Sequence, residues 1–492
     1  MEGNKRKKAK KKEEKLTHSS KKRNIKDIEA GKKLNCCAIT LTVISIIAAA
    51  IAYHVYTAVF HTPELPAVDL DVWWGPNHTK HSRDTSIRPF RIVFSDAMQE
   101  QLVRKFDHHR RLEQQKSFND TAWTYGVHSS AQEQIFSFWQ YKYKPKERER
   151  FFNKFDHFKT NVQGLDLHFM RVRPETENIK VLPIMLLHGW PSSFREFYEV
   201  APLLTTQRPG YDFVFEVIVP SLPGFGFSQG AVRPGLGPFQ MAIVMRNLMN
   251  RLGFTKYYIH GGDFGHVIGS IMATLFPNEV LGFHSSMPMT LSKPAELGRL
   301  LGAIWPTFVD AEHWQKMYPL KEKLEFLIEE TGYSHLQATK PDTIGIALNE
   351  SPLGLATYIL DKIMIYTDPE NKFLKDGGLS KYYNGSMIDL IDNVMVYWVS
   401  ESITTSMRIY KELSRVELTL EQIPTSVPTW FLCLKNEMFY NPEFLLRWKY
   451  PNLIGTTTHN FGGHFAALEK PQELADDIFL AVKIFKKIKF EM

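Results

Sequence analysis

Cysteine is scarce in this chain. Three occur among 492 residues: Cys36 and Cys37 are adjacent, and Cys433 lies within the apolar stretch VPTWFLCL. This set cannot build a disulfide framework. Cysteine and histidine also form no cluster with the spacing of metal ligands, so the sequence predicts no metal site.

The main body of the chain lacks an excess of either charge. Residues 1–33 contain 14 Lys/Arg and 5 Asp/Glu, a net charge of +9, whereas the remaining residues contain 46 and 48, a net charge of −2. The basic character therefore belongs to one lysine-rich tail. We expect no nucleic-acid-binding surface on the folded domain.

Residues 36–59 contain no Asp, Glu, Lys or Arg. As a helix, this segment spans roughly 36 Å, enough to cross a hydrocarbon core of about 30 Å. A cleaved signal peptide usually has a shorter apolar region, so a permanent single-pass anchor is predicted. The lysines before it favour a cytosolic N-terminus and a lumenal body. Four sequons are compatible with a lumenal body: Asn77, Asn119, Asn349 and Asn384.

The stretch YYIHGGDFGHVIGSIMA, residues 257–273, reads as a strand, a glycine turn and a helix. Many hydrolases place a nucleophilic serine at the apex of such a turn. Here the apex is Asp263. A carboxylate is already ionised at neutral pH, so it can attack an sp³ carbon and form an alkyl ester without a base. The simpler alternative is an aspartate that caps the following helix.

Apolar runs that end in turns alternate with helical patterns along the chain. Residues 181–191 and 213–228 read as buried strands that lead into loops, and residues 239–254 have a helical period. The stretches KYYIH, VPTWFLCL and NLIGTTTHNFGGHF continue the series. This alternation predicts an α/β fold with a mostly parallel sheet, helices on both faces and right-handed crossovers. Between residues 290 and 420 the pattern is helical, which predicts an inserted helical cap.

Two further motifs fall at the edge of the sheet where strands end and sites form. HGWP, residues 188–191, follows an early strand, and His464 lies in NFGGHFAALEKP. The triad order of the α/β-hydrolase fold is nucleophile, acid, histidine. Glu437, which follows the strand VPTWFLCL, is the acid best placed between Asp263 and His464. In this scheme His464 activates the water that cleaves the ester, and Glu437 orients the imidazole.

The tetrahedral intermediate of that step places an oxyanion on Asp263. The backbone N–H groups of Phe264 and Trp190 are candidate donors, and each such donor is typically worth about 3 kcal/mol. Alkyl halides and epoxides both suit a carboxylate nucleophile. A halide is often held by a tryptophan beside the nucleophile, whereas Phe264 has no side-chain donor. An epoxide needs a proton donor such as tyrosine; Tyr333 and Tyr410 are available in the predicted cap, but sequence physics alone does not select them from 19 tyrosines.

Several stretches together resemble the microsomal epoxide hydrolase family, which includes the insect juvenile hormone epoxide hydrolases. They run from about residue 70 to the C-terminus: WWGP (73–76), SIRPF (86–90), FDHFKTNVQGLDLHF (155–169), HGWPSSFREFYEVAPLL (188–204), FEVIVPSLPGFGFS (215–228), GGDFG (261–265), TKPDTIGIALNESPLGLATYIL (339–360), MVYW (395–398) and GGHFAALEKP (462–471). The resemblance implies conversion of lipophilic epoxides to vicinal diols without a cofactor, by an enzyme anchored in the endoplasmic reticulum (microsomal) membrane.

The resemblance also implies residue roles. Asp263 is the nucleophile, His464 the base and Glu437 the acid, and Tyr333 and Tyr410 are the pair that protonates the epoxide oxygen. A lipophilic epoxide and membrane lipid are the implied partners.

The chain departs from the family pattern at two positions. The elbow is usually GGDWG, but Phe264 replaces the tryptophan, and His266 falls where the family tends to have a small residue. Two alternatives stay open: a haloalkane dehalogenase-type hydrolase, and a weakly catalytic relative that binds lipid epoxides or hormones. The membrane side is open as well, because mammalian relatives are generally held to face the cytosol. Trp73 and Trp74 fit either the membrane interface or packing against the body.

From these patterns we predict a basic tail (1–35), a transmembrane anchor (36–59), an N-terminal epoxide-hydrolase segment (60–175), an α/β-hydrolase core in two parts (176–290 and 421–492) and a helical cap between them (291–420).

Overall fold

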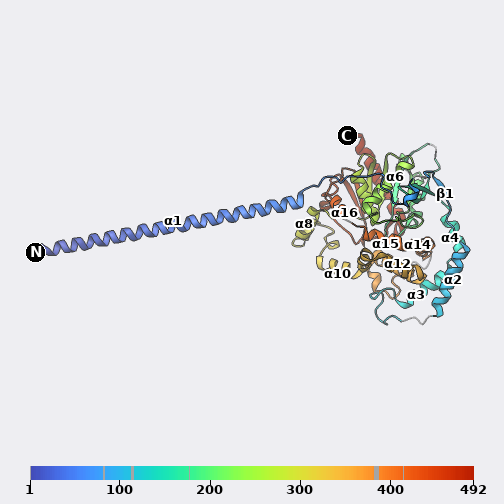
Figure 1. Ribbon diagram of the computed structural model, residues 1–492, viewed down its shortest axis with the longest axis horizontal. Helices are drawn as coiled ribbons and strands as arrows, with labels where there is room; N and C mark the ends of the chain where they lie inside the picture. Colours follow the sequence, from blue (N-terminus) through green and yellow to red (C-terminus); the bar gives the residue numbers. More distant parts are fainter. Residues whose placement is uncertain are drawn as a thin grey trace. The chain divides into compact units, whose positions relative to one another are not determined.

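The computed structural model describes residues 2–80, 84–111, 116–176, 178–381, 387–413 and 415–491. It contains two compact units, Met1–His61 and Thr62–Met492. The first unit consists mainly of one long helix, α1 (Gly3–Phe60), drawn in blue in Figure 1. Within it, Ala38–Phe60 is long and apolar enough to cross a membrane by length and composition, with a mean hydropathy of 2.1. This segment overlaps the predicted anchor.

A single sheet organises the second unit. Among the described residues it has nine strands in the order β1-β2-β3-β5-β4-β6-β7-β8-β9. The strands from β1 to β5 in this order pair antiparallel, and those from β5 to β9 pair parallel. The strands are β1 (Arg88–Phe90), β2 (Asp156–Val162), β3 (Leu165–Val172), β4 (Lys180–Leu187), β5 (Phe213–Pro220), β6 (Tyr257–Gly261), β7 (Val280–Ser285), β8 (Thr429–Cys433) and β9 (Leu453–Thr458).

Helices cover both faces of this sheet. Successive strand residues point to opposite faces, and β7 shows what each face meets. A Cβ on Gly282 would collide with Phe485 of α19 (Pro471–Glu491), whereas the next residue, Phe283, packs against Gly269 of α7 (Phe264–Leu275). The helix α5 (Val200–Thr205) packs on α19, and α6 (Pro238–Arg251) packs on α7. The predicted α/β-hydrolase fold is confirmed.

The described part of the chain between β7 and β8 consists of helices joined by loops and contains no strand. Ser351 shows how one of these helices starts: its hydroxyl accepts a 3.0 Å hydrogen bond from the N–H of Gly354, with Pro352 at the first helical position. Helices α12 and α15 pack against each other, and their labels lie together in Figure 1. The helices are α8 (Lys293–Gly302), α9 (Pro306–Val309), η4 (Trp314–Lys316), α10 (Leu320–Glu330), α11 (Gly332–Thr339), α12 (Pro341–Glu350), α13 (Pro352–Thr367), η5 (Pro369–Phe373), η6 (Leu379–Lys381), α14 (Met387–Ser400), α15 (Ile403–Lys411) and α16 (Arg415–Glu421).

The segment before the core packs on it. Trp73 and Trp74 are buried, and the backbone N–H of Trp74 donates to the carbonyl of Gln163 at 2.8 Å. The sequence left two placements open for these tryptophans, the membrane interface and the body. The structure shows them packed against the body. The remaining helices are η1 (Asn77–Thr79), α2 (Asp96–Arg111), α3 (Ser129–Ser137), η2 (Phe138–Lys142), α4 (Pro145–Phe152), η3 (Phe194–Tyr198), α17 (Glu443–Leu446) and α18 (Ala466–Glu469). The boundaries predicted within residues 60–492 stay predictions.

Candidate active site

Asp263 lies at the apex of the turn between β6 and α7. Its backbone has φ +50° and ψ −129°, a region that non-glycine residues rarely adopt. The turn packs so closely on β4 that only glycine fits at Gly265. A Cβ there would collide with the carbonyl oxygen of Leu187 in β4. This geometry is a strained strand-turn-helix elbow, which presents the carboxylate at the carboxyl edge of the sheet.

One predicted oxyanion donor contacts the carboxylate directly. The backbone N–H of Trp190, just after β4, donates to Oδ1 of Asp263 at 2.8 Å. Gly189 allows this approach, because a Cβ there would collide with the Asp263 carboxyl. Phe264 begins α7, so its N–H belongs to the first helical turn, where backbone donors lack intrahelical partners. Both predicted donors therefore lie beside Asp263.

His464 connects Asp263 with Glu437. Its Nδ1 lies 2.9 Å from Oε2 of Glu437, and its Nε2 lies 3.4 Å from Oδ2 of Asp263. Glu437 follows β8, and the backbone N–H of His464 donates to the carbonyl of Tyr366 in α13 at 3.0 Å. The three predicted triad residues thus form one contiguous chain of contacts.

The electrostatics of His464 depend on both carboxylates. Burial is the largest single influence and lowers the pKa of His464. The charges and hydrogen bonds of Glu437 and Asp263 together outweigh burial and hold that pKa well above its usual value. In the free enzyme the imidazole therefore carries a proton.

Tyr333 in α11 and Tyr410 in α15 lie over the same edge. The Tyr333 ring stacks on the Trp190 ring with a centroid distance of 5.0 Å, and the Tyr410 ring meets it edge-on at 5.9 Å. The two tyrosine rings are 5.9 Å apart. Burial is the main cause that raises both tyrosine pKa values, and the nearby charge of Asp263 adds to it. Both hydroxyls are therefore protonated at neutral pH and can donate.

An apolar cavity of about 650 Å³ opens beside these groups. Four of the predicted site residues line it: Asp263, Phe264, Tyr333 and Tyr410. The rest of the lining includes aliphatic and sulfur-containing side chains, namely Val267, Ile271, Met287, Met289, Leu291, Leu413, Leu418 and Met438. A cavity of this size and lining suits a lipophilic small molecule. The Phe264 ring lies edge-on to Tyr410 with centroids 4.8 Å apart, so this departure from the usual tryptophan shapes the cavity wall.

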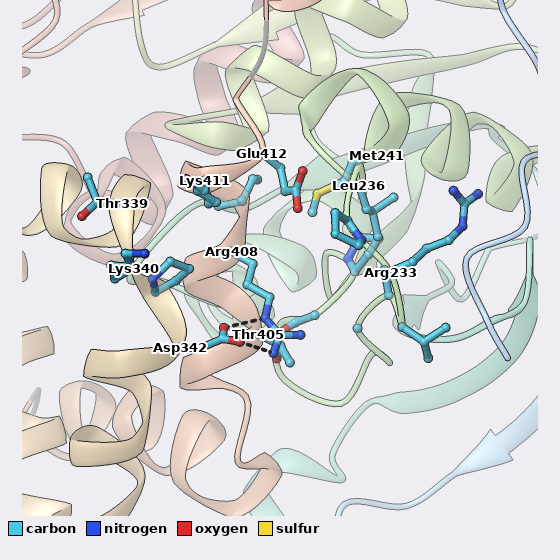
Figure 2. Close-up of a pocket in the computed structure, with 18 of the residues that line it drawn as sticks. Arg233, Leu236, Met241, Thr339, Lys340, Asp342, Thr405, Arg408, Lys411 and Glu412 are labelled. Carbon is cyan, nitrogen blue, oxygen red and sulfur yellow. Dashed lines mark hydrogen bonds and ion pairs between the residues drawn. The ribbon is translucent and has the colours of Figure 1, made fainter.

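A second hollow of about 520 Å³ lies between α12, α15 and the loop before α6. Figure 2 shows its lining, in which Arg408 pairs with Asp342; the two N–O distances are 2.8 and 3.0 Å. Its lining includes none of the predicted site residues. We therefore assign the candidate active site to the apolar cavity.

Sequence reasoning missed two carboxylates at the site. Glu196 lines a small cavity with Asp263 and His464. Glu469 accepts hydrogen bonds from the backbone N–H groups of Gly463 and Phe465, at 2.9 and 3.0 Å, and so holds the His464 loop. Both residues occur in family-like stretches, but no spacing rule marks them. His266 is buried away from the reacting groups: its Nδ1 lies 2.9 Å from the Ser285 hydroxyl.

No metal site accompanies these groups within the part of the chain that the structure describes. There, no group of three or more His, Cys, Asp or Glu side chains is arranged to hold a metal ion.

Comparison with known proteins identifies the family. Residues 87–197 match the family model described as epoxide hydrolase N terminus, and residues 183–314 match the alpha/beta hydrolase fold. The chain is 45% identical to juvenile hormone epoxide hydrolase of Bombyx mori over 87% of this chain and 93% of that protein. It is 40% identical to epoxide hydrolase 1 of Oryctolagus cuniculus over 83% of this chain and 91% of that protein.

Solved structures agree with this result. The crystal structure of the Bombyx mori enzyme matches with a TM-score of 0.83 over 86% of this chain and all of that chain, at 45% identity. The Aspergillus niger epoxide hydrolase matches with a TM-score of 0.65 at 26% identity, over 82% of this chain and 98% of that chain. The chain therefore belongs to the microsomal epoxide hydrolase family and is an epoxide hydrolase with the α/β-hydrolase fold.

Proposed function

We propose that this enzyme converts lipophilic epoxides to vicinal diols through a covalent ester on Asp263. The observation that carries the proposal is the meeting of Asp263, His464 and two tyrosines at the end of an apolar cavity. Relatives that are 44–45% identical are named juvenile hormone epoxide hydrolases, so a terpenoid epoxide is the first substrate to test.

In the first step the carboxylate opens the epoxide. Oδ1 of Asp263 is held by Trp190, so the other oxygen, Oδ2, attacks an epoxide carbon. A bond forms between Oδ2 and that carbon as the carbon–oxygen bond of the ring breaks. The departing oxygen takes a proton from Tyr333 or Tyr410, whose hydroxyls are protonated at neutral pH. Positioned proton donors typically contribute 10²–10⁴-fold to rate.

In the second step water cleaves the ester. Esterification removes the charge of Asp263, one of the two carboxylates that raise the pKa of His464. That pKa then falls, and the imidazole can pass its proton to the tyrosinate left by the first step and act as a base. It takes a proton from water as the water oxygen attacks Cγ of Asp263. The N–H groups of Trp190 and Phe264 stabilise the oxyanion on Oδ1, and the diol leaves with Oδ2.

We also propose that the enzyme is anchored in the endoplasmic reticulum membrane by Ala38–Phe60. Three leucines that line the cavity are 42–55% exposed, which suits the entry of a lipophilic substrate: Leu291, Leu413 and Leu418. Deleting residues 1–60 should move the enzyme from the membrane fraction to the soluble fraction, and retention in the membrane would contradict the anchor.

The lysine-rich tail supports a lumenal body. Asn77 and Asn119 are exposed and suited to report this, whereas the Asn349 side chain donates to Thr404 at 3.0 Å. Asn384 lies outside the described residues. Glycosidase sensitivity that disappears in Asn77→Gln or Asn119→Gln would support a lumenal body. A protein unglycosylated at both sites that is digested by protease in sealed microsomes would contradict it.

A single turnover in ¹⁸O-labelled water tests the mechanism. With enzyme in excess over a lipophilic epoxide, the ester route puts the label into the Asp263 carboxylate and an unlabelled oxygen into the first diol. Labelled diol with unlabelled Asp263 would mean direct attack by water. Halide release from an alkyl halide in the same assay tests the dehalogenase alternative. Binding without turnover in the unmutated enzyme would favour the carrier alternative.

A further inference from the structure

Asp263 lines a second cavity besides the apolar one. This cavity has a volume of about 20 Å³, room for about one water molecule. Its polar lining comes from Ser192, Glu196, His260 and Ser286, together with Asp263 and His464. The cavity therefore has the volume and the polar partners that one bound water molecule requires, and it lies beside the proposed nucleophile and base.

Glu196 is the carboxyl group in this cavity that the ester mechanism leaves unused. It lies in η3, close behind the HGWP loop, and its Oε2 accepts a 2.8 Å hydrogen bond from the Ser192 hydroxyl. That bond fixes the carboxyl group and leaves Oε1 for another partner. Burial raises the pKa of Glu196 to about 8, although Ser192 and His464 lower it.

We propose that this cavity holds the water that hydrolyses the Asp263 ester, and that Glu196 positions the water by accepting a hydrogen bond from it. The proposal rests on the ester mechanism above. The substrate portion of the ester fills the apolar cavity, and Trp190 holds Oδ1, so a water in the second cavity has a separate approach to Cγ.

The step balances with the groups present. One water proton passes to Nε2 of His464, and the water oxygen bonds to Cγ of Asp263. The other proton initially faces Glu196, which fixes the direction of attack. The bond between Cγ and Oδ2 breaks, and the diol oxygen takes the proton from His464. The remaining water proton then passes from the Asp263 carboxyl group to His464 and restores the protonated imidazole of the free enzyme. Glu196 is unchanged, so it is a positioning residue.

Substitution at Glu196 separates the two chemical steps. Glu196→Leu removes the acceptor at similar volume, and Glu196→Gln keeps an acceptor oxygen. Rapid-quench single turnovers, followed by mass analysis of the Asp263 peptide, measure ester formation and ester hydrolysis separately. In Glu196→Leu we expect ester formation within about threefold of the native rate and hydrolysis at least about tenfold slower, so that ester accumulates. In Glu196→Gln we expect both rates to stay within about threefold of native.

A control variant separates positioning from general damage. Glu279→Leu makes the same chemical change at a partly buried carboxylate that pairs with Arg246. It should lower stability without changing the ratio of the two rates. Ala467→Val places methyl groups in the water cavity and should slow hydrolysis selectively; this test also stands if Glu196→Leu does not fold.

Native hydrolysis in both Glu196→Leu and Ala467→Val would overturn the proposal, as would equal slowing of the two steps in Glu196→Leu. If the native enzyme formed no ester at all, the ester mechanism itself would fail. A native ester together with unaffected variants would refute only the role of Glu196.

Discussion

The backbone N–H of Trp190 donates a 2.8 Å hydrogen bond to Oδ1 of Asp263, 73 residues further along the chain. This bond makes the two carboxylate oxygens inequivalent. Oδ1 accepts the bond from Trp190, while Oδ2 lies 3.4 Å from Nε2 of His464. In the proposed mechanism this difference assigns the attack on the epoxide to Oδ2 and leaves Oδ1 as the carbonyl oxygen of the ester.

The tyrosines should act in ester formation and not in hydrolysis. Tyr333→Phe and Tyr410→Phe each keep a ring against Trp190 but remove a proton donor. We expect each variant to form ester about 10–100-fold more slowly, and the double variant to lose more. Rapid-quench measurement of the ester checks this. Native ester formation in the double variant would rule out both tyrosines as the acid.

Glu437→Gln should impair hydrolysis and move its pH dependence. Burial lowers the pKa of His464, and the charge of Glu437 is the largest influence that raises it. Without that charge the pKa falls, so the acidic limb of the hydrolysis profile should shift to lower pH. The maximal rate should fall by at least about 100-fold, because the imidazole loses its orienting partner. An unchanged profile would contradict the predicted role of Glu437.

Phe264→Trp should change selectivity more than chemistry. The proposed oxyanion donor at this position is the backbone N–H, which the substitution keeps. The larger indole would intrude on the 650 Å³ cavity that Phe264 lines beside Tyr410. We expect kcat/KM for bulky epoxides to fall about tenfold relative to small ones, with ester hydrolysis within about threefold of native. Equal effects on both substrates would contradict a role in shaping the cavity.

Buried histidines should make the fold sensitive to acid. Burial lowers the folded-state pKa of His157 and His188 to about 4 and that of His266 to about 3, whereas an unfolded histidine titrates near 6.5. The unfolded chain thus binds more protons, and stability present above about pH 6.5 is lost as pH falls toward these values. Each histidine should contribute a slope of about 1.4 kcal/mol per pH unit.

Urea unfolding between pH 7.5 and 4.5 measures this slope. His266→Gln keeps a polar group beside Ser285 and Tyr450 and should reduce the slope by about one histidine's share. If the variant lowered the free energy of unfolding equally at every pH, without changing its slope against pH, His266 would stabilise the fold only through packing and hydrogen bonds.

Short-range patterns in the sequence were sufficient for much of this protein. The glycine elbow around Asp263, the alternation of strands and helices and the apolar stretch near the N-terminus are local signals, because each depends on neighbouring residues. The order of the motifs along the chain also made Glu437 and His464 candidates, since both follow predicted strands and the carboxyl ends of parallel strands share one edge of the sheet.

Contacts between distant segments required the tertiary structure. Among 19 tyrosines, only the packing of the helical region on the sheet places Tyr333 and Tyr410 over Trp190. Other contacts between distant segments bury Trp73 and Trp74 and place Glu196 beside Asp263 and His464 in a water-sized cavity. No local pattern encodes such distances. They arise from how whole elements pack. Burial then raises the pKa of Glu196, and the neighbouring carboxylates raise the pKa of His464.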